Sequence, residues 1–355
     1  MNTLLNQLRQ KMSEAKAEAL LVTQPANVRY LSGFSSPEDG RVLLTEDKVL
    51  LITDGRYIQQ AKEESRLETL ITTPQENWVD KVAELAKPYK LAIESDHLVV
   101  EYFHHLKEKT AQEPISTKGL VNTFRLIKNP QELAFIKEAA HITDQAFSYI
   151  INFIGPGVTE IEVALELERY IRKHSAESAF SIIVASGVRS SMPHGLASNK
   201  AIQAGELVTL DFGAKLEGYH SDMTRTIGVG DVSDEQQAMY AALLEAQETA
   251  LTAIAPGKDG KDIDALVRET LKKHNLDTYF THGLGHGVGL EIHEGPRMSP
   301  RSPKGSEMLK TGMTVTVEPG VYLPGQYGAR IEDLIVISDH GCERLSHSTK
   351  VFLSV

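Results

Sequence analysis

Short apolar runs alternate with amphipathic segments through the first third of the chain. The apolar runs have the length and the Leu, Ile and Val content of buried strands, and they lie at 19–24, 41–47, 48–53, 67–73 and 90–95. Segments with a helical period lie at 55–65, 77–89 and 97–109, and the chain opens on an amphipathic helix pattern that leads into the first strand. This alternation predicts an α/β domain over residues 1–121.

The remainder, residues 122–355, contains an internal repeat. Segments 153–174 and 253–274 align without gaps at an offset of 100, and each reads as a Pro-Gly turn followed by a helix. The matches are Pro156 with Pro256, Gly157 with Gly257, Glu162 with Asp262, Val163 with Ile263, Ile171 with Leu271, and RKH with KKH at the helix ends. Agreement in register over this length predicts a duplicated α+β domain, whose halves have approximate two-fold symmetry and face a shared cleft.

Each half ends in a sequence typical of a β-hairpin, and each hairpin carries two acidic residues. If the first turn is centred between the Leu and the Glu of KLEG, Asp211 faces Asp222 across the two strands. If the second turn is centred on the Gly of PGQ, Glu318 faces Glu332. Like charges that face each other destabilise a strand pair, so both pairs require a compensating partner.

Two explanations compete for these acidic pairs. The carboxylates are solvated or paired with Arg225 and Arg330, or they bind cations. Solvation fits poorly, because the flanking runs LVTL, VTV and LIVI have the pattern of buried strands. Two divalent cations would offset four carboxylates, and His286 would add a nitrogen ligand. Such a set suits Mn²⁺, Mg²⁺, Co²⁺ or Fe²⁺ better than a thiolate-rich zinc site, so the sequence predicts a dinuclear metal centre.

The segment 281–296, THGLGHGVGLEIHEGP, combines three histidines with five glycines. His282 and His286 have the spacing of two metal ligands on a helix, but each interior glycine costs a helix about 1 kcal/mol relative to alanine. An extended segment fits better, with His282 and His286 on one face and glycines on the other. A glycine-rich turn with inert histidines is the alternative. The acidic pairs favour the first interpretation, in which the glycines let His286 approach the metals.

Composition narrows the class of protein further. The chain has 355 residues and a net charge of −11, which argues against a nucleic-acid partner. Its single cysteine, Cys342, excludes an intrachain disulfide and favours a reducing compartment. No run of 18 apolar residues and no signal-peptide pattern occurs, so we expect a cytoplasmic protein with no membrane contact.

The motifs as a set resemble those of the pita-bread metallopeptidases, in the branch of aminopeptidase P, prolidase and creatinase. They are PHG at 193–195, LDFGAKLEGYHSDMTRT at 210–226, the glycine-histidine segment at 281–296, TVEPGVY at 316–322 and ARIED at 329–333. The resemblance covers essentially the whole chain and implies an amino-terminal creatinase-like domain over 1–121 and a pita-bread catalytic domain over 122–355. It also implies five metal ligands, namely Asp211, Asp222, His286, Glu318 and Glu332.

The resemblance further implies an activity and residue roles. The expected enzyme is an X-Pro dipeptidase or X-Pro aminopeptidase that acts on short proline-containing peptides, as a homodimer with two divalent ions, most often Mn²⁺, with Co²⁺, Zn²⁺ or Fe²⁺ as alternatives. The expected catalytic residues are His194, His293, Glu318, Arg330 and Tyr219, and the expected substrate-binding residues are His194, His282 and His293. His220 departs from the family pattern and is expected to face outward. A methionine aminopeptidase-like exopeptidase and an inactive peptide-binding relative remain as alternatives.

Overall fold

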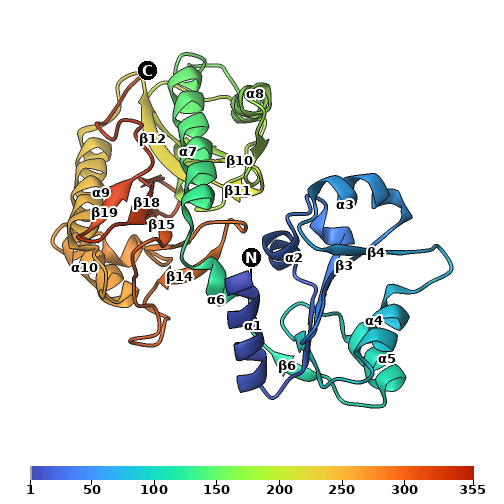
Figure 1. Cartoon of the computed structure of the whole chain (residues 1–355). Coiled ribbons are helices and arrows are strands. Elements are labelled where there is room, and N and C mark those ends of the chain that lie inside the picture. Colours follow the sequence, from blue (N-terminus) through green and yellow to red (C-terminus); the bar gives the residue numbers. More distant parts are fainter. Residues whose placement is uncertain (1) are drawn as a thin grey trace. The chain divides into compact units, whose positions relative to one another are not determined.

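The computed structural model describes residues 2–355, which form two compact units (Figure 1). The first unit ends at Arg125 and the second begins at Leu126. No helix in this part of the chain combines the length and apolar character needed to cross a membrane.

The first unit is built on a six-stranded mixed sheet in the order β4-β3-β2-β1-β5-β6. The pairs β1–β2 and β2–β3 are antiparallel, while β3–β4, β1–β5 and β5–β6 are parallel. The strands span Ala19–Val22 (β1), Arg41–Leu44 (β2), Val49–Asp54 (β3), Glu68–Thr72 (β4), Leu91–Glu94 (β5) and Ile115–Thr117 (β6). The five predicted strands are therefore confirmed, and β6 is an addition.

Apolar side chains cover both faces of this sheet. Leu20 and Val22 of β1 belong to one core cluster, and Ala19 and Leu21 belong to the other, as the period of a strand requires. The helices span Asn2–Glu14 (α1), Pro25–Ser32 (α2), Ile58–Glu64 (α3), Trp78–Ala86 (α4), Val100–Thr110 (α5) and Asn122–Arg125 (α6). Helices α1 and α2 supply the first cluster, and α4 and α5 supply the second. The first unit is thus the predicted α/β domain.

The second unit repeats a pair of helices. Its helices span Pro130–Ile150 (α7), Glu160–Lys173 (α8), Asp234–Ala253 (α9) and Gly260–Lys272 (α10). Pro130 is the first residue of α7, as predicted, behind a capping box at Asn129. The turns before α8 and α10 also correspond: the Gly157 N–H donates to the Ile202 carbonyl, and the Gly257 N–H to the Leu309 carbonyl. The offset of 100 residues is therefore a structural repeat.

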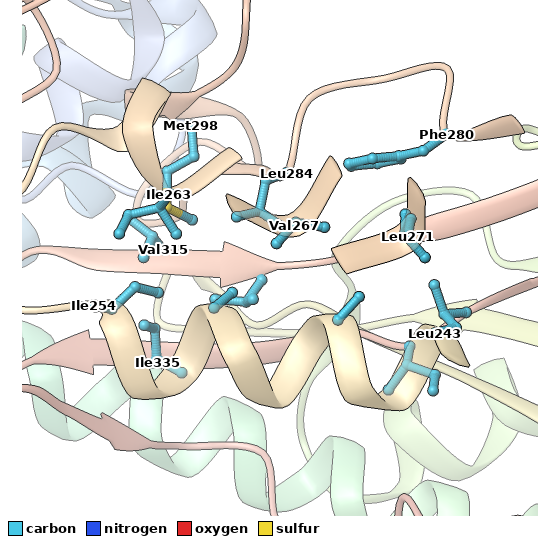
Figure 2. Packing of buried hydrophobic residues seen from close by; sticks show 14 of the residues in the cluster. Leu243, Ile254, Ile263, Val267, Leu271, Phe280, Leu284, Met298, Val315 and Ile335 are labelled. Atoms are coloured by element: carbon cyan, nitrogen blue, oxygen red, sulfur yellow. The ribbon is translucent and has the colours of Figure 1, made fainter. Parts of the chain in front are cut away.

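Each helix pair covers the strands of its own half. The first half contains β7 (Glu177–Ser178), β8 (Ile183–Ser186), β9 (Glu206–Phe212), β10 (Ala214–Leu216), β11 (Tyr219–His220) and β12 (Met223–Val229). The second contains β13 (Gly285–Gly287), β14 (Glu294–Met298), β15 (Thr314–Val317), β16 (Gly320–Leu323), β17 (Tyr327–Arg330), β18 (Asp333–Ile337) and β19 (Cys342–Arg344). Figure 2 shows the core of the second half, where Ile254 at the end of α9 and Ile263 of α10 lie near Val315 and Ile335 of the sheet.

The two hairpin predictions have different outcomes. The first is wrong by two residues: Asp211 pairs with Thr224, not with Asp222. Its turn is centred on Glu217 and Gly218, which both have positive φ (50° and 80°), as a two-residue hairpin of type I′ requires. The second is confirmed. The pair Val321–Ala329 of β16–β17 and the pair Val317–Asp333 of β15–β18 follow one register. Glu318 and Glu332 lie between these two ladders and therefore occupy facing positions.

Candidate active site

A cavity of about 400 Å³ opens in the second unit between its two halves. The acidic pairs and the glycine-histidine segment, widely separated in sequence, both contribute to its wall. Of the residues predicted for the site, all except Tyr219 line the cavity: His194, Asp211, Asp222, His282, His286, His293, Glu318, Arg330 and Glu332. The shared cleft expected from the repeat is therefore present.

The tightest cluster in the cavity joins the two halves. The ligand atoms of Asp222, His286 and Glu332 all lie within 4.8 Å of one another. Asp222 directly precedes β12 of the first half, whereas Glu332 and His286 belong to the second. The Thr224 hydroxyl donates to Glu332 Oε2 at 2.6 Å and thereby orients that carboxylate toward the cluster. Two carboxylates and an imidazole at this spacing can hold a divalent cation.

Glu318 extends the cluster on one side. Its Oε1 lies 3.3 Å from His286 Nε2 and accepts a hydrogen bond from the Thr316 hydroxyl at 3.2 Å. His286 Nε2 is also 3.7 Å from Asp222 Oδ2, while His286 Nδ1 lies 3.1 Å from the Gly287 carbonyl. A donor at Nδ1 leaves Nε2 with a free lone pair aimed at the carboxylates, which is the tautomer that a metal ligand needs.

Asp211 extends the cluster on the other side. Its Oδ2 accepts a hydrogen bond from Arg330 Nη2 at 2.6 Å, so one of the arginines considered as an alternative partner does pair with a cavity carboxylate. Arg225, the other arginine considered, pairs with Asp333, and neither of these residues lines the cavity. Asp211 Oδ1 is buried and has no hydrogen-bond partner among residues 2–355. A buried carboxylate oxygen without a donor fits a cation ligand.

The pKa values of the clustered acids reflect this crowding. Burial, reinforced by the charges of neighbouring acids, raises the pKa of Asp222 and Glu332 well above the ordinary range. Burial also raises the pKa of Glu318 to about 8. The donor set as it stands thus disfavours its own ionisation, and bound cations would reverse that effect. The chemistry of these residues fits a metal centre.

Burial favours the neutral form of three cavity histidines, His282, His286 and His293. Burial, reinforced by neighbouring cationic groups, lowers the pKa of His282 and of His286 to about 4. His282 Nε2 lies 3.0 Å from the Tyr322 hydroxyl, and that hydroxyl accepts a hydrogen bond from Arg330 Nη1 at 2.7 Å. The His293 ring meets the His286 ring edge to face at 4.3 Å, and His293 is exposed to the cavity mouth. Neutral imidazoles can act as ligands or as hydrogen-bond donors.

The glycines of the 281–296 segment allow close approach of backbones. A Cβ on Gly285 would lie 2.1 Å from the Thr316 carbonyl oxygen, and one on Gly287 would lie 1.9 Å from the Gly295 carbonyl oxygen. The predicted extended conformation is confirmed for Gly285–Gly287, which forms β13 between β14 and β15. The glycines therefore let the His286 strand fit between two neighbouring strands, which is how His286 reaches the acidic pairs.

Two residues lie differently from their expected places. Tyr219 was expected beside the site, but it is outside the cavity lining. Its hydroxyl donates to Glu132 at 3.0 Å and its ring stacks on Phe135. His220 was expected to face outward, but it is buried, and its backbone N–H donates to the Gly289 carbonyl at 2.9 Å. His220 therefore joins the first half to the loop that follows β13.

Three contributors to the site were not predicted. Thr224 orients Glu332, Tyr322 bridges His282 and Arg330, and Arg297 lines the cavity. Thr224 and Tyr322 lie within motifs that were singled out for other residues. Thr224 lies two residues after Asp222, and in a strand this spacing places both side chains on one face. The spacing could therefore have identified Thr224 as a site residue.

Comparison with known proteins agrees with this geometry. Residues 134–339 match Metallopeptidase family M24, and residues 5–127 match the Creatinase/Prolidase N-terminal domain. The chain belongs to metallopeptidase family M24. The predicted resemblance and the predicted fold class, a creatinase-like α/β domain followed by a duplicated pita-bread domain, are confirmed.

Relatives within the family match over nearly the full length. The chain is 38% identical to the Xaa-Pro dipeptidase of Pyrococcus furiosus, across 98% of this chain and 99% of that protein. The structure of an Xaa-Pro dipeptidase from Bacillus anthracis superposes with a TM-score of 0.95 at 42% identity and covers 99% of each chain. The structure of an X-Pro aminopeptidase from Thermotoga maritima superposes with a TM-score of 0.89 at 35% identity. The match covers 98% of this chain and 100% of that one.

Proposed function

We propose that this M24 peptidase hydrolyses the X-Pro bond of short peptides, with a preference for X-Pro dipeptides. The observation that carries the proposal is the convergence of Asp211, Asp222, His286, Glu318 and Glu332 on one cavity. An X-Pro bond lacks the amide N–H by which many peptidases bind extended substrates, so it requires a dedicated site. The names of the relatives, Xaa-Pro dipeptidase and X-Pro aminopeptidase, support this substrate class.

The five cavity ligands would hold two divalent ions. In this proposal Asp222 and Glu332 would supply one carboxylate ligand from each half. Asp211, His286 and Glu318 would supply the remaining ligands. When bound, such ions lower the pKa of a water molecule and polarise the scissile carbonyl. The carboxyl-rich, thiol-free donor set favours Mn²⁺ over a structural zinc site.

The remaining side chains act on the substrate. Glu318 accepts a proton from the attacking water at its carboxylate and passes it to the proline nitrogen that leaves. His293, together with His194, donates hydrogen bonds to the carbonyl oxygen that gains negative charge. Arg330 holds the Asp211 carboxylate through its Nη2 and the Tyr322 hydroxyl through its Nη1. Tyr322 in turn orients His282, which faces the substrate.

The first test is metal dependence. We expect chelator-treated protein to lose X-Pro cleavage, and we expect Mn²⁺ or Co²⁺ to restore it. Among residues 2–355, Arg330 is the one cationic side chain paired with the clustered carboxylates, and it cannot balance four of them. Proline release from an X-Pro dipeptide, measured before and after addition of single metals, checks this. Full activity in protein shown by elemental analysis to be free of metal contradicts the proposal.

Arg297 supports the preference for dipeptides. Arg297 lines the cavity and is an exposed residue, and within residues 2–355 its guanidinium has no hydrogen-bond or ion-pair partner. The carboxylate of an X-Pro dipeptide lies one residue beyond the scissile bond, whereas a longer peptide has a neutral amide at that position. A free guanidinium in the cavity therefore favours a substrate that ends in a carboxylate there.

The change Arg297→Met tests this preference. A hydrogen bond to a charged group contributes about 1.5–3 kcal/mol, so we expect kcat/KM for an X-Pro dipeptide to fall about 10–100-fold. For an X-Pro-X tripeptide the fall should be less than about threefold, because that substrate lacks the carboxylate. Parallel kinetics on the two substrates give the comparison. Equal losses in kcat/KM on the two substrates would show that Arg297 does not contribute to the preference for dipeptides.

Three finer features belong to the same proposal. We propose Mn²⁺ as the working metal, a homodimer as the assembly and the cytoplasm as the compartment. The donor set supports the first, and the single cysteine, which excludes an intrachain disulfide, supports the third. Elemental analysis of protein purified without added metal, and its molar mass in solution, test the first two.

A further inference from the structure

A buried ion network lies directly behind the strand pair that carries two of the cavity carboxylates. Val317 of β15 and Asp333 of β18 are register partners. Each is adjacent in sequence to a cavity carboxylate, Glu318 in the first case and Glu332 in the second. Because successive side chains of a strand point to opposite faces, Asp333 extends away from the cavity while Glu332 extends into it.

Asp333 is the centre of this network. One carboxylate oxygen accepts from Arg225 Nη2 at 2.7 Å, and the other accepts from Lys350 Nζ at 2.7 Å. The side chains of Asp333, Arg225 and Lys350 are 0%, 1% and 8% exposed. The carboxylate is therefore held from both sides by cationic donors.

Lys350 also connects to the strand of Glu318. Its Nζ donates to Gln247 Oε1 at 2.6 Å, and Gln247 Nε2 donates to the Val317 carbonyl at 3.3 Å. The same Nζ pairs with Glu248 at 2.5 Å. One ammonium group thus holds both strands of the pair: β18 through Asp333, and β15 through Gln247 of α9, which donates to the Val317 carbonyl.

Arg225 joins the network to the first half of the domain. It lies on β12 next to Thr224, and its Nη1 donates to the Thr224 carbonyl at 2.9 Å and also contacts the Glu332 carbonyl. The Thr224 hydroxyl holds the Glu332 carboxylate on the opposite side of the strand. The charges balance, because Arg225 and Lys350 are matched by Asp333 and Glu248.

We propose that Lys350 is a positioning residue for the metal centre, which fixes the separation of Glu318 and Glu332 from behind the strands. This inference rests on the proposed function, since it assumes that those carboxylates bind metal. Lys350 lies outside the cavity lining, so we infer that it acts through other residues and not on the substrate or the ions. Its effect passes through Asp333 and Gln247 to the backbone on which the two carboxylates stand.

Physical chemistry gives the reason for such a device. Glu318, Glu332 and their acidic neighbours repel one another when they are ionised, and this repulsion would push the strands apart. A buried ion network behind the strands resists that movement without adding positive charge to the cavity. With a neutral side chain at position 350, Asp333 and Gln247 each lose a buried donor and turn toward other partners, so the strand pair loosens.

The experiment uses Lys350→Met in the full chain, with Lys200→Met as the matched control. Lys200 forms a partly buried ion pair with Glu206 at 2.6 Å in the first half and does not line the cavity. Both proteins are stripped with chelator and titrated calorimetrically with Mn²⁺ alone. We expect Lys350→Met to bind Mn²⁺ about 10–100-fold more weakly, the usual effect of removing a residue that orients metal ligands. The affinity of Lys200→Met for Mn²⁺ should lie within about threefold of the wild-type value.

Kinetics separate positioning from mere stability. At saturating Mn²⁺, Lys350→Met should lower kcat for an X-Pro dipeptide and leave KM within about twofold, because the substrate contacts are intact. If both variants lower the melting temperature but Lys350→Met keeps wild-type Mn²⁺ affinity and kcat, the positioning role is refuted. Should Lys350→Met fail to fold, Gln247→Met, which cuts only the link to Val317, carries the same expectations and the same refutation. Failure of the wild type itself to bind Mn²⁺ would instead refute the proposed function.

Discussion

Asp222→Asn is expected to lower X-Pro hydrolysis by about 10³-fold or more, since metal ions supply several kcal/mol of transition-state stabilisation. The substitution keeps the size of the side chain but removes the charge that lies at the centre of the cluster with His286 and Glu332. Asp222 is the carboxylate of this cluster that comes from the first half of the domain. Its loss should therefore weaken both ion sites and not only one.

The metal-free protein should respond in the opposite direction. Burial and the charges of Glu332, Asp211 and Glu318 raise the pKa of Asp222, so at neutral pH its ionised form costs the folded state free energy. A neutral Asn removes that cost, and metal-free Asp222→Asn should be no less stable than metal-free wild type. The holo protein should lose most of the stabilisation that bound metal gives to the folded state.

Thermal melts with and without Mn²⁺ measure both effects together. Asp231→Asn, which removes the same charge from an exposed position outside the cavity, is the control and should keep the wild-type response to metal. An Asp222→Asn protein whose melting temperature rises with Mn²⁺ as much as that of wild type would show that Asp222 is not a ligand.

Most of the residues that line the cavity were predictable from the sequence, but their geometry was only partly so. The second hairpin has Gly325, with positive φ, at the centre of its turn, and the predicted register holds along both ladders. The first hairpin was displaced by two residues, because Glu217 adopts a positive φ that its side chain gives no reason to expect. Asp211 and Asp222 nevertheless reach the same cavity, since a shift of two residues keeps every side chain on its original face.

Interactions that depend on the distant backbone were not predictable. Burial of His220 depends on the Gly289 carbonyl, which only the folded second half brings near. The short strand Ile115–Thr117 has three residues and no strong apolar pattern, so only its parallel pairing with β5 defines it. Helix α2, by contrast, is marked in the sequence by Pro25 at its first position and by Gly33 at its end, where the glycine adopts the left-handed conformation.

Gly287→Ala is expected to disrupt the site from the backbone outward. The added Cβ would lie 1.9 Å from the Gly295 carbonyl oxygen and 2.4 Å from its carbon, and both atoms are backbone that cannot rotate away. Gly287 also pairs with Val315 on the other side, so β13 cannot withdraw from the contact. The strand bearing His286 or the segment bearing His293 must move.

Both movements should be measurable. Overpacking of this kind costs about 1–3 kcal/mol, and for a domain of this size that lowers the melting temperature by roughly 2–10 °C. A displacement of about 1 Å at a catalytic or ligand residue lowers turnover by about 10²-fold. We therefore expect weaker Mn²⁺ binding and a loss of kcat of that order, together with the lower melting temperature.

Gly155→Ala separates a steric effect from the general effect of losing a glycine. Gly155 lies in the same unit, has no atom within 4 Å of the position that a Cβ would take, and does not have positive φ. It should therefore keep wild-type stability, Mn²⁺ affinity and turnover. If Gly287→Ala matches Gly155→Ala in all three measurements, the close approach of β13 to its neighbours does not position His286, and the glycines of the 281–296 segment need another explanation.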